Sequence, residues 1–190
     1  MTGSLPVLLT VGPLTALFVT ALRQENGAAV VNTAAALLVT LVPAAVEAAL
    51  GVSFTPLLTY WVGGASVLHC VGMLGWYETI PGWDHLTHTV SSALAAALLY
   101  AGLLVAADLS GAVAAAVTLL VIVVLGVLWE LMELVMRELG ERHGIEPVLI
   151  HYGWRDTVLD MVFDVVGVVL VLVVDLRLFV SVFETLVAAL

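Results

Sequence analysis

Six long apolar segments account for most of this chain and leave little polar sequence between them. At about 1.5 Å of helical rise per residue, each is long enough to cross a bilayer core of about 30 Å. The predicted spans cover residues 5–22, 28–50, 56–75, 85–107, 111–136 and 157–174. We therefore predict an all-α fold, a polytopic bundle of membrane-spanning helices.

The composition agrees with this class. The chain is 63% hydrophobic and 11% charged, with a mean hydropathy of +1.19, far more apolar than a soluble domain. Its length suits a single integral membrane domain over residues 1–190. No basic n-region precedes the first span, so we expect residues 5–22 to stay in place and not to be a removed signal peptide. Residues 176–190 predict a short amphipathic helix or an extension of the last span.

The charged residues are few and mostly acidic. Fifteen acids oppose five bases, which gives a formal net charge of -10, and all five bases are arginine. This acidic, lysine-free composition argues against nucleic-acid binding and resembles that of proteins from extreme halophiles. A second explanation is that the acids gather around a cation. The single cysteine, Cys70, excludes an intramolecular disulfide and a cysteine-based zinc cluster.

The arginines predict the orientation in the membrane. Arg23, Arg137, Arg142 and Arg155 lie in or beside the odd-numbered loops, and only Arg177 lies on the other side. Positive residues are enriched in cytoplasmic loops. We therefore expect a multi-pass protein of the cell membrane whose odd-numbered loops are cytoplasmic.

Three aspartates, Asp156, Asp160 and Asp164, repeat every four residues around the start of the last predicted span. Four residues turn a helix by about 400°. The three carboxylates are therefore spread over only about 80° around the helix axis and form one stripe along the helix. Gly167 continues the stripe without a side chain. Acids are costly in a bilayer and usually face a bundle interior or a polar cavity. The stripe is therefore predicted to face other spans.

Other spans bring polar residues to the same leaflet. They are Asn32, His69, Asp84, His85, His88, Glu130 and Glu133. Because these stripes have no other acceptable place in lipid, the fourth, fifth and sixth spans are predicted to be mutual neighbours. The residues lie on the side of the odd-numbered loops, so we expect the polar site to be cytoplasmic as well. This one-sided convergence is the strongest functional signal in the sequence.

Imidazole and carboxylate groups on facing helices are the ligands from which helical bundles build divalent metal sites. Carboxylates packed into one leaflet also need a cation, a proton or water to offset their charge. The predicted ligands of a divalent metal ion are Asp84, His85, His88, Glu130, Glu133, Asp156, Asp160 and Asp164. Among them, the expected catalytic groups are Glu130, Glu133, Asp160 and Asp164.

A structural explanation stays open for each of these residues taken alone. Asp84 and Asp156 are suited to cap the helices that follow them. Glu133 stands four residues before Arg137, in the favourable order for a helical ion pair. If such contacts explain the whole cluster, its role is to lock the bundle.

Most of these residues fall in three stretches, Trp83–His88, Trp129–Glu133 and Gly153–Gly167. The stretches resemble the Asp-x-x-x-His, Glu-Leu-x-Glu and Asp-Thr-x-x-Asp-Met-x-x-Asp-x-x-Gly patterns of the YjdF-like family of small prokaryotic inner-membrane proteins. The resemblance covers about residues 60–175 and implies a membrane location and a shared polar site, without a reaction. His85 departs from the pattern, so the resemblance does not support it as a ligand.

Three functions are compatible with these features. The first is a metal-dependent hydrolase or transferase that acts on a membrane lipid or lipid phosphate, with the metal polarising a phosphoryl or ester oxygen. The second is a non-catalytic accessory subunit with a structural polar cluster, which leaves an oligomer or a partner subunit open. The third is an ion- or proton-coupled transporter. The position of the acids argues against it, because they are confined to one leaflet.

Overall fold

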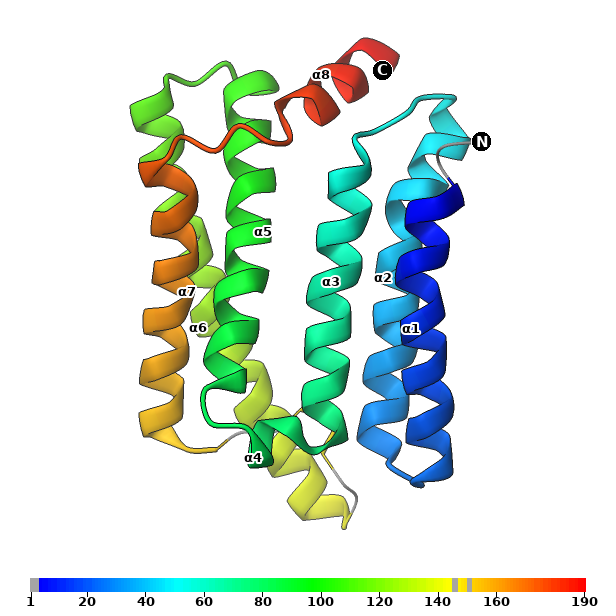
Figure 1. The fold of residues 1–190 in the computed structure, drawn as a ribbon. Helices are drawn as coiled ribbons and strands as arrows, with labels where there is room; N and C mark the ends of the chain where they lie inside the picture. The colour runs from blue at the N-terminus through cyan, green and yellow to red at the C-terminus, as the bar shows by residue number, and fades with distance from the viewer. Residues whose placement is uncertain (1–3, 145–146, 150–151) are drawn as a thin grey trace.

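The computed structural model describes residues 4–144, 147–149 and 152–190, and the regular elements in these ranges are all helical. Figure 1 shows two groups of long helices standing side by side, α1–α3 and α5–α7. In chain order the elements are α1 (Ser4–Arg23), α2 (Gly27–Leu50), α3 (Pro56–Val71), the π-helical turn η1 (Gly72–Trp76), α4 (Tyr77–Thr79), α5 (Trp83–Val105), α6 (Gly111–His143), α7 (Trp154–Val173) and α8 (Val180–Ala189).

Among the described residues, five helical segments are long and apolar enough to cross a membrane, which confirms the predicted helical membrane bundle. They are Leu5–Arg23, Gly27–Leu50, Pro56–Thr79, Trp83–Val105 and Gly111–His143. The sixth predicted span is α7. Its 20 residues correspond to about 30 Å, and it runs beside α5 (Figure 1). It is not among these five segments, because Arg155 and its three aspartates all fall within the first 11 of its 20 residues.

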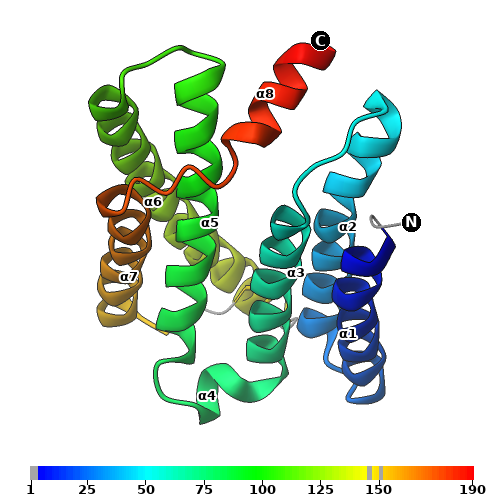
Figure 2. The same ribbon diagram turned by 45° about the horizontal axis from the view of Figure 1, so that its top comes forward.

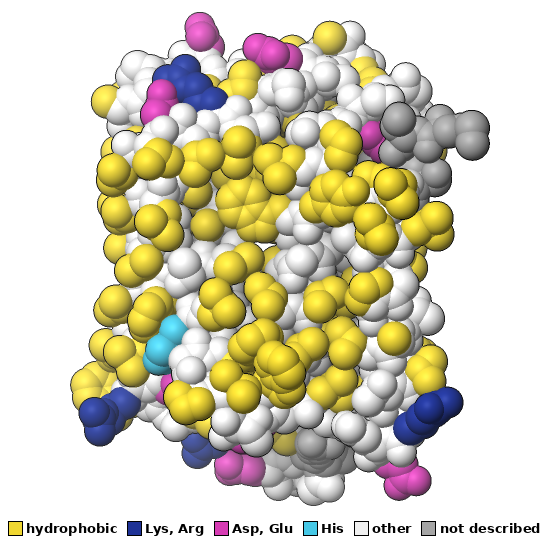
Figure 3. Space-filling model, in the orientation of Figure 1, with side chains coloured by type: hydrophobic (Ala, Val, Ile, Leu, Met, Phe, Trp, Pro, Cys, Tyr) yellow, Lys and Arg dark blue, Asp and Glu magenta, His cyan; other side chains and the backbone are white. Residues whose placement is uncertain are grey.

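The apolar and charged side chains are distributed over the surface in the way that a bilayer requires. Figure 3 shows hydrophobic side chains across the middle of one face, with most of its arginine and acidic side chains at the two ends. Many large apolar side chains on the long helices are exposed, including Leu38 at 71% and Leu120 at 65%. Contiguous exposed apolar surface of this kind is typical of contact with membrane or with another protein.

The predicted neighbours are confirmed, since α5, α6 and α7 all contact one another. A run of buried alanines on α5, from Ala93 to Ala101, packs in one core cluster with Val168 and Val171 of α7. Small residues let membrane helices approach closely. At Gly167 an added Cβ would overlap the Ser92 hydroxyl and the Thr89 carbonyl of α5. The stripe of α7 therefore lies directly against α5.

The end of α6 differs from the prediction because of local interactions. α6 does not end near residue 136 but continues to His143. Ion pairs between Arg137 and Glu141 and between Glu138 and Arg142, at spacing i to i+4, extend it beyond the apolar segment. It ends at Gly144, whose φ of 62° is left-handed. Of the two alternatives predicted for residues 176–190, the structure has the separate short helix, α8, which packs against α5.

The predicted N-terminal caps are wrong. α5 begins at Trp83 after Gly82 (φ 77°), which places Asp84 inside the first turn. α7 begins at Trp154 after Gly153 (φ 112°), which places Asp156 inside its first turn as well. Glycine adopts these positive φ angles without steric cost. Neither aspartate is occupied as a helix cap, so the Asp84 carboxylate is available to the site described next.

Candidate functional site

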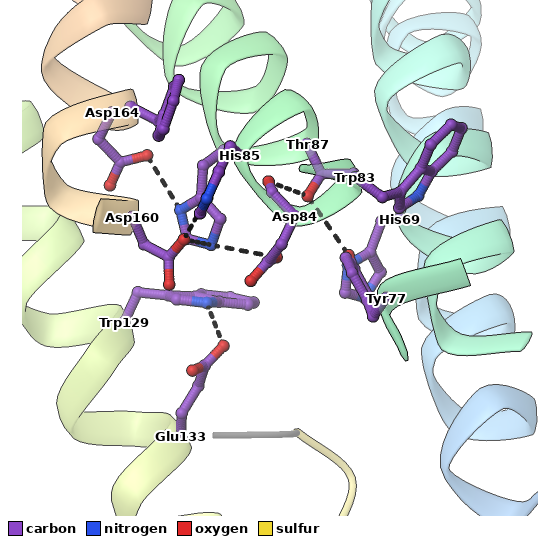
Figure 4. Close-up of polar contacts among 12 residues, drawn as sticks. His69, Tyr77, Trp83, Asp84, His85, Thr87, Trp129, Glu133, Asp160 and Asp164 are labelled. Carbon is purple, nitrogen blue, oxygen red and sulfur yellow. Dashed lines mark hydrogen bonds and ion pairs between the residues drawn. The ribbon is translucent and has the colours of Figure 1, made fainter. Parts of the chain in front are cut away.

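Polar residues of α5 and α7 meet at one end of the second helix group (Figure 4). Asp84, His85 and His88 come from the first two turns of α5, while Asp160 and Asp164 come from the middle part of α7. α6 leaves the bundle at the same end (Figure 1). The convergence that the sequence predicts is therefore present for these helices, while the catalytic and ligand roles stay predictions.

His88 lies at the centre of this group. Its Nδ1 is 3.2 Å from Asp164 Oδ1. Its Nε2 is 3.7 Å from Asp84 Oδ1 and 3.9 Å from Asp160 Oδ1. Both ring nitrogens thus face carboxylates, with Asp164 on one side of the ring and the other two aspartates on the opposite side.

One ligand atom each from Asp84, His88 and Asp160 lies within 4.8 Å of the others. Asp160 is only 2% exposed, and its Oδ1 has no hydrogen-bond partner among the described residues. A buried carboxylate oxygen without a donor is costly unless a cation or a proton compensates it. Two carboxylates and an imidazole form a donor set that suits a divalent first-row metal ion.

A glycine on α6 makes room for Asp164. An added Cβ at Gly126 would lie 2.7 Å from Asp164 Oδ2 and 3.0 Å from Met161 Sδ. With glycine there, α6 closes against α7, and Asp164 is held at 8% exposure beside His88. The sequence analysis did not include Gly126, because a single glycine in an apolar segment gives no signal of its own.

His85 lies at the edge of the cluster. Its Nδ1 is 3.5 Å from Asp160 Oδ1, and its ring stacks on Phe163 with centroids 4.4 Å apart and planes 7° from parallel. That stacking fixes the ring beside Asp160, although His85 is not in the group whose ligand atoms converge.

The acids of α6 are placed differently from one another. Glu130 is buried at 5% exposure, and its Oε2 has no hydrogen-bond partner within the described ranges. Glu133 accepts a hydrogen bond of 2.9 Å from Trp129 Nε1. In Figure 4 the Trp129 indole lies between Glu133 and the aspartates. Neither glutamate nor Asp156 belongs to the converging group of three.

A second polar network, centred on His69, contributes to the same cavity. His69 Nδ1 is 2.8 Å from the Tyr77 hydroxyl, and its Nε2 is 3.0 Å from Asn32 Oδ1. Asn32 Nδ2 donates to the carbonyl oxygens of Ala28 and Val148, so its Oδ1 is the atom that faces His69. The proton of neutral His69 therefore sits on Nε2, and Nδ1 accepts from Tyr77.

Tyr77 was not predicted from the sequence as part of the site. The turn η1 reverses the chain through Gly75 at φ 109°, and an added Cβ on Gly72 would overlap the Tyr77 ring. This tight turn places the Tyr77 hydroxyl beside His69. The backbone of Leu74 and Gly75 is not helical, and a kink of this kind cannot be read from the apolar pattern.

A cavity of about 690 Å³ joins the two networks. It lies between the two helix groups. Most of its lining comes from α2, α3, α5 and α6, and the rest is supplied by Met73, Tyr77, Leu149, Tyr152 and, from α7, Asp164. At its polar end are Asp84, His88, Asp164 and His69, and the rest of its wall is mainly alanine, valine and leucine. A concave, mostly apolar space with a few convergent polar groups is the usual form of a small-molecule site.

These features define a small integral membrane protein with a His/Asp cluster at one end of its bundle. The family model "Predicted membrane protein (DUF2238)" matches residues 5–180, and the chain belongs to that family. The match confirms the resemblance to the YjdF-like family inferred from the three sequence stretches. Comparisons with curated proteins and with solved structures gave no match.

Proposed function

We propose that this protein is a metal-dependent membrane hydrolase or transferase that acts on a lipid or a lipid phosphate. The observation that carries the proposal is the convergence of Asp84, His88 and Asp160 within 4.8 Å inside a membrane bundle, where Asp84 and His88 also line the polar end of the cavity. A divalent ion held there would polarise a phosphoryl or ester oxygen and activate water.

The ligand atoms in this proposal are Asp84 Oδ1, His88 Nε2 and Asp160 Oδ1. Asp164 has a different role, because it faces the other ring nitrogen at 3.2 Å. A carboxylate that accepts the Nδ1 proton fixes the tautomer and directs the Nε2 lone pair toward a metal. Among the predicted catalytic groups, Glu130 is the general base that we favour, since its buried Oε2 has no other partner in the described part of the chain.

The first test is the metal content of protein purified without a chelator. We expect about one divalent ion per chain by elemental analysis, since three converging ligands define one site. Removing the ion should abolish hydrolysis or transfer on phosphorylated lipids in proteoliposomes, and adding it back should restore the activity. Protein that contains no metal and gains no stability from added divalent ions would contradict the proposal.

One observation favours the structural alternative, an accessory subunit whose cluster only locks the bundle. Both His88 nitrogens face carboxylates, so a protonated imidazole could itself supply the compensating charge. In that case chelators should leave the thermal stability unchanged, whereas the His88→Gln substitution should lower it. For a metal enzyme, both treatments should lower it.

Replacing Asp164 by asparagine tests its orienting role. We expect the Asp164→Asn substitution to weaken metal binding by about 10–100-fold, the usual cost of losing such an outer carboxylate, while the bundle stays folded. Titration against a chromophoric chelator measures the change. Asp108→Asn is the control, because Asp108 is exposed at the end of α5 remote from the site, and its φ of 50° also suits asparagine. Equal affinities in the two variants would remove Asp164 from the site.

The cytoplasmic location of this end of the bundle is also a proposal, supported by the arginine distribution. Single cysteines in a Cys70→Ser background test it at exposed positions, with Gln24→Cys and Glu141→Cys at this end and Ala107→Cys at the other. An impermeant thiol reagent applied from outside should label only Ala107→Cys. Labelling of the first two variants with protection of the third would reverse the orientation.

A further inference from the structure

The cavity changes from polar to apolar in the same direction along the four helices that supply most of its lining. On α5 the lining passes from Asp84 and His88 to Leu94 and Leu98. The same change runs from Asn32 to Val39 on α2, from His69 to Val62 on α3 and from Glu133 to Ile122 on α6. Because these four helices alternate in direction, the change follows position across the membrane and not position in the chain.

The depth of the apolar part matches one leaflet. Ten residues separate His88 from Leu98 on α5, which is about 15 Å of helix. One leaflet contributes half of a hydrocarbon core of about 30 Å. A hydrocarbon chain that starts at the polar cluster would therefore end near the middle of the bilayer.

The cavity also reaches the surface within the membrane. Val39 lies near the middle of α2 and Leu125 near the middle of α6, and both line the cavity. Val39 is 54% exposed and Leu125 is 50% exposed. Surface at the middle of a membrane-spanning helix faces hydrocarbon, so a lipid chain can enter from the side without crossing water.

We propose that the cavity binds one membrane lipid, with a single hydrocarbon chain along the apolar wall and a phosphate head group at the polar end. The phosphate part rests on the proposed function. Asp84, Asp160 and Asp164 make that end acidic, and an anionic head group would be repelled there without a cation. The chain-binding part rests only on the shape and polarity of the cavity.

The test uses the full-length protein in proteoliposomes with two photoreactive lipids, each with a diazirine in one acyl chain. One probe is phosphatidic acid and the other is uncharged diacylglycerol. We expect both to label cavity residues of α2, α5 and α6. The Ala35→Trp and Ala95→Trp substitutions, at lining positions, should reduce labelling by both probes about tenfold, because the indole occupies the space of the chain.

Ala45→Trp is the matched control, since Ala45 is exposed on the same helix as Ala35 but does not line the cavity. All variants are first checked for the parent's thermal transition in detergent. Labelling by both probes that is the same in the parent and in the cavity variants would overturn the inference. If labelling is lost in both cavity variants but is not changed by chelator, the result would support binding of the hydrocarbon chain and contradict the metal in the proposed function. If chelator removes only phosphatidic acid labelling, both proposals are supported.

Discussion

The Asp160→Asn substitution should lower the affinity for the divalent ion by about a hundredfold or more, since losing an inner ligand costs at least as much as losing an outer one. Asparagine keeps the shape of the side chain and removes the charge. The Asp160 side chain is 3% exposed, against 13% for His88 and 21% for Asp84, so it is the most enclosed of the three ligands. Lipid hydrolysis or transfer should fall with metal occupancy.

For the same Asp160→Asn variant we also expect an increase in the thermal stability of the metal-free protein. In metal-free protein, Asp160 is a buried carboxylate whose Oδ1 has no hydrogen-bond partner among the described residues and which lies within 4.8 Å of the Asp84 carboxylate, so removing its charge should raise the thermal stability. Melting curves recorded with and without chelator measure both effects. We expect chelator to lower the transition temperature of the parent and to leave that of the variant unchanged. A parent that is indifferent to chelator would support the structural alternative.

Asp175→Asn is the chemically identical control at the other end of the bundle. Asp175 is exposed and accepts hydrogen bonds from Arg177 and Tyr100. These bonds hold the pKa of Asp175 below its usual range, so this aspartate is ionised and already paired. The substitution should change neither metal content nor the response to chelator. If it lowered metal content as much as Asp160→Asn, the loss would reflect general damage.

The sequence was sufficient to predict that polar residues gather at one end of the bundle. Long apolar segments determine which residues lie at equal depth, and the four-residue spacing of Asp160 and Asp164 places them on one helix face. Because lipid penalises such a face, it must turn toward other helices. The contact of α7 with α5 and α6 follows from these two arguments alone.

The division of roles within the cluster could not be predicted in this way. Whether Asp160 or Asp164 faces Nε2 of His88 depends on the separation and rotation of α5 and α7. The separation and rotation of these helices are determined by close packing at Gly126 and Gly167. Because glycine has no side chain, these positions add nothing to the apolar and polar pattern of the sequence. The position of Tyr77 could not be predicted for a similar reason, because it is determined by the turn η1.

Packing at Gly167 leads to the second large effect. A Cβ there would overlap the Ser92 hydroxyl and the Thr89 carbonyl and lie 2.9 Å from Ala93 N. Two of these three neighbours are backbone atoms of α5, which cannot rotate away. Gly167→Ala should therefore lower the free energy of unfolding by about 1–3 kcal/mol, the usual cost of overpacking, and Gly167→Leu should lower it by more.

The loss of stability in Gly167→Leu should be accompanied by loss of metal, because moving α7 away from α5 separates Asp160 and Asp164 from His88. Gly64→Ala on α3 is the control, since no described atom lies within 4 Å of its added Cβ apart from its own helix backbone. That variant should gain up to about 1 kcal/mol, because alanine has the higher helix propensity. Unfolding in mixed micelles and metal titration measure both quantities. If Gly167→Ala is as stable as Gly64→Ala, then α7 does not approach α5 closely enough to place both aspartates around one histidine.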